Sequence, residues 1–63
     1  MDLEVLELLI NIGKPIRWPT ATWLVMDVFD IVSIEAKDII GRLIDAKQLN
    51  WNNGGWLEVN YEI

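Results

Sequence analysis

The chain has 63 residues, is 52% hydrophobic and carries a formal net charge of −5 at pH 7. It contains no cysteine and no histidine, which excludes disulfides and thiolate zinc sites and removes the commonest general base. The length fits one domain over residues 1–63, and ten carboxylates against five cations disfavour a nucleic-acid partner, since phosphate contacts need a basic face.

No segment of the sequence is typical of a membrane span, a signal peptide or a catalytic site. The longest apolar run is well short of the roughly 18 residues of a span, so we expect a cytoplasmic protein without a membrane partner. A chain of this size has little room for a cleft, so we expect no enzyme activity, cofactor, metal or small-molecule substrate. Three carboxylate pairs at i, i+3 spacing are best explained as solvated acidic faces: Glu4 with Glu7, Asp27 with Asp30, and Glu35 with Asp38.

The first predicted helix runs from Leu3 to about Ile12, with Asp2 as its N-cap and Gly13 as its C-cap. Leu8 falls among its polar residues and is expected to be exposed. The buried stripe at helical spacing is expected to comprise Leu3, Val5, Leu6, Leu9, Ile10 and Ile12.

Residues 16–18 lie between two prolines and are long enough for a short strand. A second helix is predicted from Pro19 to about Phe29, because proline suits the first turn of a helix. Its β-branched residues leave a strand as the alternative. Trp18 and Trp23 are expected to pack in the core, with a partner groove as the alternative. The expected buried residues of this helix are Ala21, Leu24, Val25 and Val28.

A third helix is predicted to begin after a tight turn, with Ser33 as its N-cap and Val32 as a hydrophobic staple. Its outer surface carries mixed charges, for which we expect ordinary i, i+4 pairs such as Asp38 with Arg42. The expected buried stripe is the most regular in the chain and comprises Ala36, Ile39, Ile40, Leu43 and Ile44.

The third helix leads into a predicted β-hairpin. Parity, the alternation of side chains between the two faces of a strand, fixes the length of the loop. A two-residue loop would place Leu49 opposite Glu58 and mix apolar with polar faces. A three-residue loop over residues 53–55 places Leu49 opposite Val59 and makes one face wholly apolar, so we predict this loop with a glycine bulge. In that register Trp51 lies opposite Leu57 in the core, and Trp56 lies on the outer face opposite Asn52.

Two segments, LELLINIGKPI and IVSIEAKDIIGRLIDAKQLNW, resemble the first helix and the turn–helix–wing region of winged helix-turn-helix domains. The resemblance covers nearly the whole chain. It implies an α+β fold of three helices followed by a C-terminal hairpin, the wing, with a short strand near residues 16–18. In DNA-binding members of that superfamily, the third helix enters the major groove and the wing touches the DNA backbone. The corresponding contacts here would come from Lys37, Arg42 and Asn53.

From these patterns we expect a small non-catalytic binding module that contacts a protein partner or a second copy of itself. The expected contact residues are the exposed apolar side chains of Leu8, Ile34 and Trp56. The alternative is a small DNA-binding transcriptional regulator. Glu35 and Asp38 would meet phosphates with the wrong sign, which ranks this alternative second.

Overall fold

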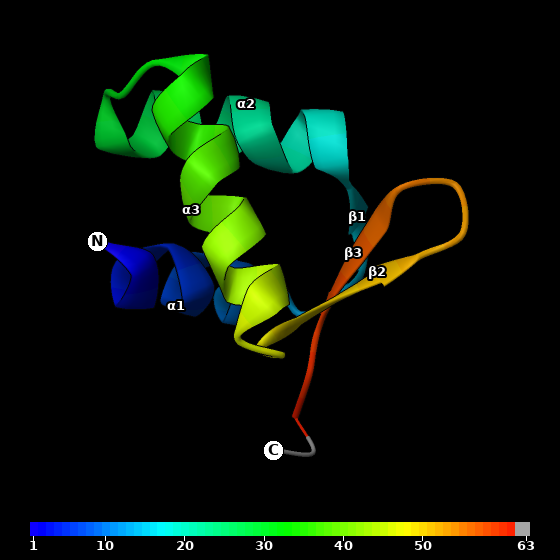
Figure 1. The fold of residues 1–63 in the computed structure, drawn as a ribbon. Helices are drawn as coiled ribbons and strands as arrows, with labels where there is room; N and C mark the ends of the chain where they lie inside the picture. Colours follow the sequence, from blue (N-terminus) through cyan, green and yellow to red (C-terminus); the bar gives the residue numbers. More distant parts are fainter. Residues whose placement is uncertain (62–63) are drawn as a thin grey trace.

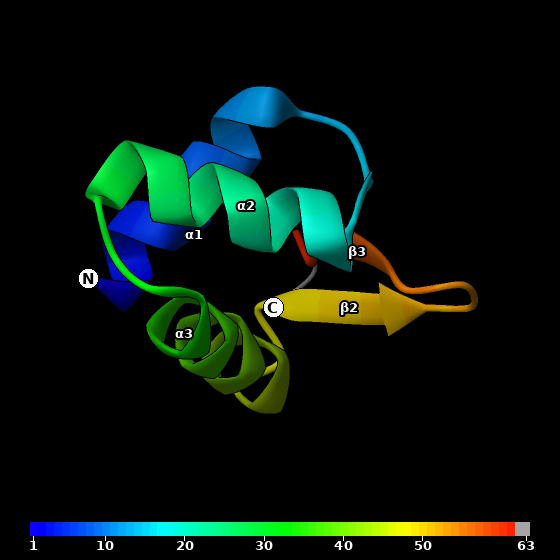
Figure 2. The same ribbon diagram turned by 90° about the horizontal axis from the view of Figure 1, so that it is seen from above.

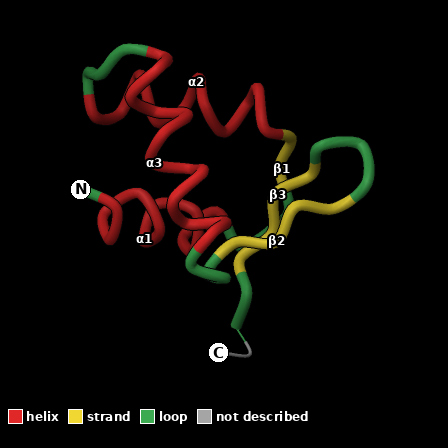
Figure 3. Tube along the Cα trace, viewed as in Figure 1, coloured by secondary structure: helices red, strands yellow, loops and turns green. Residues whose placement is uncertain are grey.

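The structure is a computed structural model that describes residues 1–61; positions 62 and 63 of the predicted domain lie outside the described residues. The helices gather against a small twisted sheet (Figure 1). The elements in order are α1 (Asp2–Ile12), β1 (Ile16–Arg17), α2 (Trp18–Phe29), α3 (Ser33–Asp45), β2 (Leu49–Asn52) and β3 (Trp56–Val59). The antiparallel sheet has the order β1-β3-β2, which completes an α+β arrangement compatible with a winged helix (Figure 3).

The core lies where the three helices meet the inner face of the sheet. The stripe on α3 is buried as predicted, apart from Ile44, which is half-buried and packs against the core. Within residues 1–61, no helix has the length and apolar character needed to cross a membrane. The buried apolar residues are Val5, Leu6, Leu9, Ala21, Val25, Ala36, Ile39, Ile40, Leu43, Leu49 and Leu57.

Two predicted stripes are wrong at their edges. On α1, Leu3 and Ile10 are exposed, whereas Leu8 is half-buried and packs against the core. On α2, Val28 is exposed and Thr22 is buried instead. A helix packed against its neighbours buries only part of its circumference. The sequence stripe of α1 was wider than that contact, so the neighbours α3 and β3 decided which of its residues are covered.

The N-caps of α1 and α3 lie one residue before the predicted caps. Met1 rather than Asp2 is the N-cap of α1, and Val32 rather than Ser33 is the N-cap of α3. Neither helix has a side-chain cap hydrogen bond. The backbone ladder of α3 begins where the Ala36 N–H donates to the Val32 carbonyl at 3.0 Å. Val32 is accordingly exposed, and Ile31 is the residue that packs against the core before α3.

All three helices are followed by a left-handed residue, and the one after α2 is Asp30, with φ 54°. Gly13 ends α1 with φ 75°, as predicted. Lys47 takes φ 65° after α3, where the N–H of Gln48 donates to the Leu43 carbonyl and that of Lys47 to the Ile44 carbonyl. This pair of hydrogen bonds is a Schellman motif, which satisfies orphan carbonyls at a helix end. The helix therefore ends at Asp45, and Lys47 lies beyond its last turn.

The hairpin of β2 and β3 has the predicted register. Leu49 pairs with Val59, Trp51 with Leu57, and Asn52 with Trp56, so the loop covers residues 53–55. Strand β1, at residues 16–17, pairs with the other side of β3. Strand β3 ends at Val59, and Tyr61 beyond it is exposed.

Candidate functional site

An apolar groove lies between α2, α3 and the hairpin, with a volume of about 290 Å³. Figure 2 shows the three elements that bound it, with β2 running beside the end of α3 and below the start of α2. Trp18 and Thr22 come from the first turns of α2, and Trp51 comes from the middle of β2. Helix α3 supplies residues at i, i+3, i+4 and i+7, which share one face of a helix: Lys37, Ile40, Gly41 and Ile44.

Trp51 forms the hairpin side of this groove, and its predicted burial is wrong. It points to the same face of the sheet as Leu49, yet Trp51 is 52% exposed and Leu49 is 2% exposed. The hairpin projects beyond the helices toward its loop (Figure 1). The start of β2 at Leu49 is therefore covered, whereas Trp51, nearer the loop, is not. Parity gives the face of a strand residue correctly, but it does not say how far the covering layer extends.

Trp18 forms the α2 side of the groove and is held by the hairpin loop. The backbone N–H of Trp18 donates to the Gly55 carbonyl at 2.8 Å. Gly55 is buried and has φ +80°, and a Cβ atom there would lie 2.6 Å from Cδ1 of Trp18. The glycine is therefore needed twice, for its left-handed backbone and for the close approach of the indole ring. Trp18 keeps enough exposure to line the groove, so its predicted core position is wrong.

Of the residues from 1 to 61 that line the groove, Lys37 is the one that carries a charge. Its Nζ lies 5.6 Å from the centroid of the Trp18 ring, a cation–π contact worth about 0.5–1 kcal/mol at exposed sites. Among residues 1–61, Lys37 forms no ion pair with a carboxylate. The rim of the groove is thus positive, although the chain as a whole is acidic.

The outer face of the sheet holds the second aromatic contact. Trp56 lies there opposite Asn52, as predicted, and its Cα partner on β1 is Arg17. The Arg17 guanidinium carbon is 5.6 Å from the centroid of the Trp56 ring. Trp56 is 40% exposed, and a cation from the neighbouring strand lies over it.

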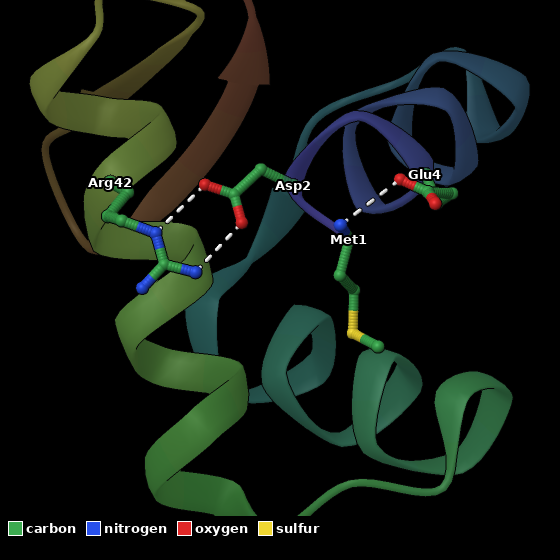
Figure 4. Close-up of polar contacts among 4 residues, drawn as sticks. All are labelled: Met1, Asp2, Glu4 and Arg42. Atoms are coloured by element: carbon green, nitrogen blue, oxygen red, sulfur yellow. Dashed lines mark hydrogen bonds and ion pairs between the residues drawn. The ribbon is translucent and has the colours of Figure 1, made fainter.

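Arg42 lies outside the groove, where it is bound to Asp2 at the start of α1 (Figure 4). Its Nε and Nη2 donate to the two carboxylate oxygens of Asp2 at 2.9 and 2.8 Å, a bidentate pair that joins α3 to the start of α1. The predicted pair between Asp38 and Arg42 is wrong, since Arg42 is bound to Asp2 instead. The Arg42 hydrogen bonds hold the pKa of Asp2 below its ordinary value and raise the pKa of Arg42. A second ion pair joins the terminal amine of Met1 to Oε1 of Glu4 at 3.3 Å.

The expected contact residues are not brought together. Leu8 packs toward the core on α1, Ile34 is 72% exposed near the start of α3, and Trp56 lies on the sheet. Lys37 reaches toward α2 and Arg42 toward α1, while Asn53 is exposed in the hairpin loop. The three expected DNA contacts therefore form no continuous basic surface.

Sequence reasoning missed the groove residues Ile40, Gly41, Ile44 and Trp51, which it assigned to the core or left unexplained. The one sequence signal for the groove was Gly41, because a glycine inside a helix lowers the stability of the helix by about 1 kcal/mol relative to alanine. Added atoms there would meet nothing within 4 Å, because the glycine faces the open groove.

A second hollow of about 230 Å³ lies between the end of α1 and β3, and it is lined by Leu9, Gly13, Lys14, Pro15, Glu58, Val59 and Tyr61. In the part of the chain from 1 to 61, no cluster of three acidic, histidine or cysteine side chains could hold a metal ion.

Comparison with known proteins gives no match: no family model, no curated protein and no solved structure matches this chain. The functional interpretation therefore depends on the geometry of the groove.

Proposed function

We propose that this chain is a winged-helix domain that acts as a non-catalytic protein-binding module, with the groove between Trp18 and Trp51 as its binding surface. A cytoplasmic location is part of the proposal. The partner would insert apolar side chains between the two tryptophans and against the open face of α3. This replaces the dispersed set of contact residues expected from the sequence with one continuous surface.

The observation that carries the proposal is the exposure of two large aromatic side chains on either side of one apolar hollow. Tryptophan is enriched among the residues that dominate binding energy, especially where it lines a pocket that the partner fills. Ile40 and Ile44 form the floor, so a partner side chain would be desolvated on several sides. Covering such a surface releases about 25 cal/mol per Å² of apolar area.

The charges support a protein partner over DNA. Arg42 is bound to Asp2, and Lys37 lies over Trp18, so the two cations of α3 point to different sides of the helix. The hairpin loop contains no lysine or arginine to meet a phosphate. A DNA-binding surface needs several cations that act together, because counterion release supplies much of the affinity.

Selection from a library of random 12-residue peptides displayed on phage tests the proposal. The immobilised domain should retain peptides, and Gly41→Leu should abolish their binding because the new side chain fills the groove without entering the core. The matched control is Asp38→Leu, which adds the same side chain to the exposed surface of the same helix.

Two results would contradict the proposal. One is the absence of any selected peptide, or peptides that bind the Gly41→Leu variant as well as the parent chain. The other is tight binding of a mixed DNA duplex at low salt with a steep salt dependence, which would favour the regulator. Circular dichroism of both leucine variants confirms that the fold is retained.

A further inference from the structure

We propose that the partner segment binds in an extended conformation and adds a strand to the open edge of β2, with alternate side chains directed into the groove. The inference rests on the proposed function and specifies the backbone shape and chemistry of the ligand. It joins two separate observations, the unpaired edge of the sheet and the apolar hollow beside it.

The order β1-β3-β2 makes β2 an edge strand. The Asn60 N–H donates to the Gln48 carbonyl and the Gly55 N–H to the Asn52 carbonyl, which sets the alternation of the antiparallel ladder. The backbone groups of Leu49 and Trp51 must then point away from β3. Among residues 1–61 no hydrogen bond outside the sheet reaches either residue, but Leu49 is buried whereas Trp51 is exposed. Trp51 therefore keeps an accessible donor and acceptor for another strand.

The two edge strands of the sheet, β1 and β2, differ in the features that prevent another chain from pairing with them. Strand β1 has two residues, follows Pro15 and carries Arg17, which are features that discourage pairing with another chain. Strand β2 has the sequence LNWN, with no proline and no charge, and the paired register across it shows no bulge. Within residues 1–61, β2 is the outermost strand of the sheet, and the last turn of α3 lies beside its start (Figures 1 and 2). The part of the β2 edge around Trp51 is exposed and lies next to the groove.

A strand added there would have a defined side-chain pattern. Side chains on neighbouring strands of a sheet project to the same face in register. Those beside Trp51 would point toward Ile44 and Gly41, and those beside Asn50 and Asn52 would point to the outer face. The segment should therefore alternate apolar and polar residues over about four positions, which is a recurring mode of peptide recognition.

Lys37 adds a charge requirement at the Trp18 end of the groove. Covering its ammonium group with an apolar segment would remove water without replacing its hydrogen bonds, whereas a carboxylate on the segment would form an ion pair. The ligand should therefore carry one aspartate or glutamate beside its apolar residues. A segment with many carboxylates is disfavoured by the net charge of −5.

The same chemistry argues against a second copy of this chain as the ligand. Edge-to-edge pairing would bring another LNWN strand to the groove, and its four side chains are all neutral. Such a strand offers no carboxylate to Lys37, and each copy brings five net negative charges. A different protein, with an apolar strand that carries an acidic residue, fits the edge and the groove better.

The test uses peptides from the phage selection, synthesised with single backbone N-methyl groups at successive positions. Because alternate amides of an added strand face β2, methylation should weaken binding by roughly tenfold or more at every second position and little between. Bound peptide should also slow hydrogen exchange of the Trp51 amide on the order of tenfold or more, and leave the Asn50 amide unchanged. The Lys37→Gln variant should reduce the preference for acidic peptides over their amide analogues.

The results separate this inference from the proposed function. Peptides that bind in a Gly41-dependent way, but show no alternation on methylation and no protection of Trp51, would overturn the added strand and keep the groove. Protection of the Trp51 amide that grows with protein concentration in the absence of peptide would show pairing with a second copy, and would overturn the different-protein ligand. Failure to select any peptide would overturn both.

Discussion

The two sides of α3 use similar apolar residues for different purposes. Toward α1, Ile39 is fully covered, and the Arg42–Asp2 pair joins the two helices at the surface. Toward the hairpin, Ile44 and Gly41 face a groove that no part of residues 1–61 fills. The first side is closed by its neighbours, whereas on the second side Ile44 packs against the core and still leaves part of its surface open. We propose that a partner covers this open part.

The largest expected effect separates two residues of β2 that share a face of the sheet. Leu49→Ala should lower the free energy of unfolding by about 2–5 kcal/mol, because it opens a cavity in the core. Trp51→Ala should cost roughly 1–2 kcal/mol, because half of its surface already faces water. Urea denaturation measures both. Equal losses would mean that Trp51 belongs to the core rather than to an open surface.

The second prediction concerns the loop that holds Trp18. Gly55→Ala should destabilise the fold by about 2–4 kcal/mol, since a Cβ atom would meet the Trp18 ring at 2.6 Å and the backbone is left-handed. Gly54→Ala is the matched control, with φ +84° but an ordinary 3.5 Å contact to Trp56, and should cost about 1–2 kcal/mol. Identical stabilities of the two variants would show that the close approach of Trp18 is unimportant.

The third prediction strengthens the end of α3 without touching either face. Lys47→Gly should raise the free energy of unfolding by about 1 kcal/mol, because φ 65° strains a residue that has a Cβ atom. Ala46→Gly, at φ −80°, is the control and should not stabilise the fold. Thermal unfolding followed by circular dichroism checks both changes. A destabilised Lys47→Gly variant would contradict the left-handed end of the helix.

The smallest expected effect belongs to the Asp2–Arg42 pair, whose partly exposed side chains are screened by solvent and salt. Because Arg42 lowers the pKa of folded Asp2, the pair stabilises the domain fully above the unfolded aspartate pKa of about 3.9. That stability is lost as the pH falls through the lowered pKa. The stability difference between the parent chain and Asp2→Asn should shrink below about pH 4 in urea titrations. A difference that stays constant with pH would contradict the pair.

Much of the fold could be predicted from local patterns. The i, i+3, i+4 stripe of α3, Pro19 in α2, Gly13 after α1 and the parity of the hairpin gave the element order and the strand register. These features work because each depends on residues close together in the chain. The predicted caps at Asp2 and Ser33 were wrong by one residue, since tertiary contacts and turn geometry set where each helix begins.

The candidate site could not be predicted in the same way. Parity placed Trp51 on the inner face, but its exposure depends on where the helical layer ends, which no local pattern encodes. The Arg42–Asp2 pair joins residues 40 positions apart, so the nearer Asp38 was the natural but wrong partner. Sequence spacing gives faces, whereas coverage and long-range pairs come only from the assembled fold.

The four tryptophans allow the most direct test of the groove as a binding surface. A ¹H–¹⁵N spectrum recorded with increasing amounts of a phage-selected peptide reports on each indole N–H separately. The groove predicts that the Trp18 and Trp51 signals shift together and saturate at one peptide per chain. Trp23, which is 65% exposed on α2 outside the groove, and Trp56, on the outer face of the sheet, should stay in place. Shifts confined to Trp23 or Trp56 would contradict the account.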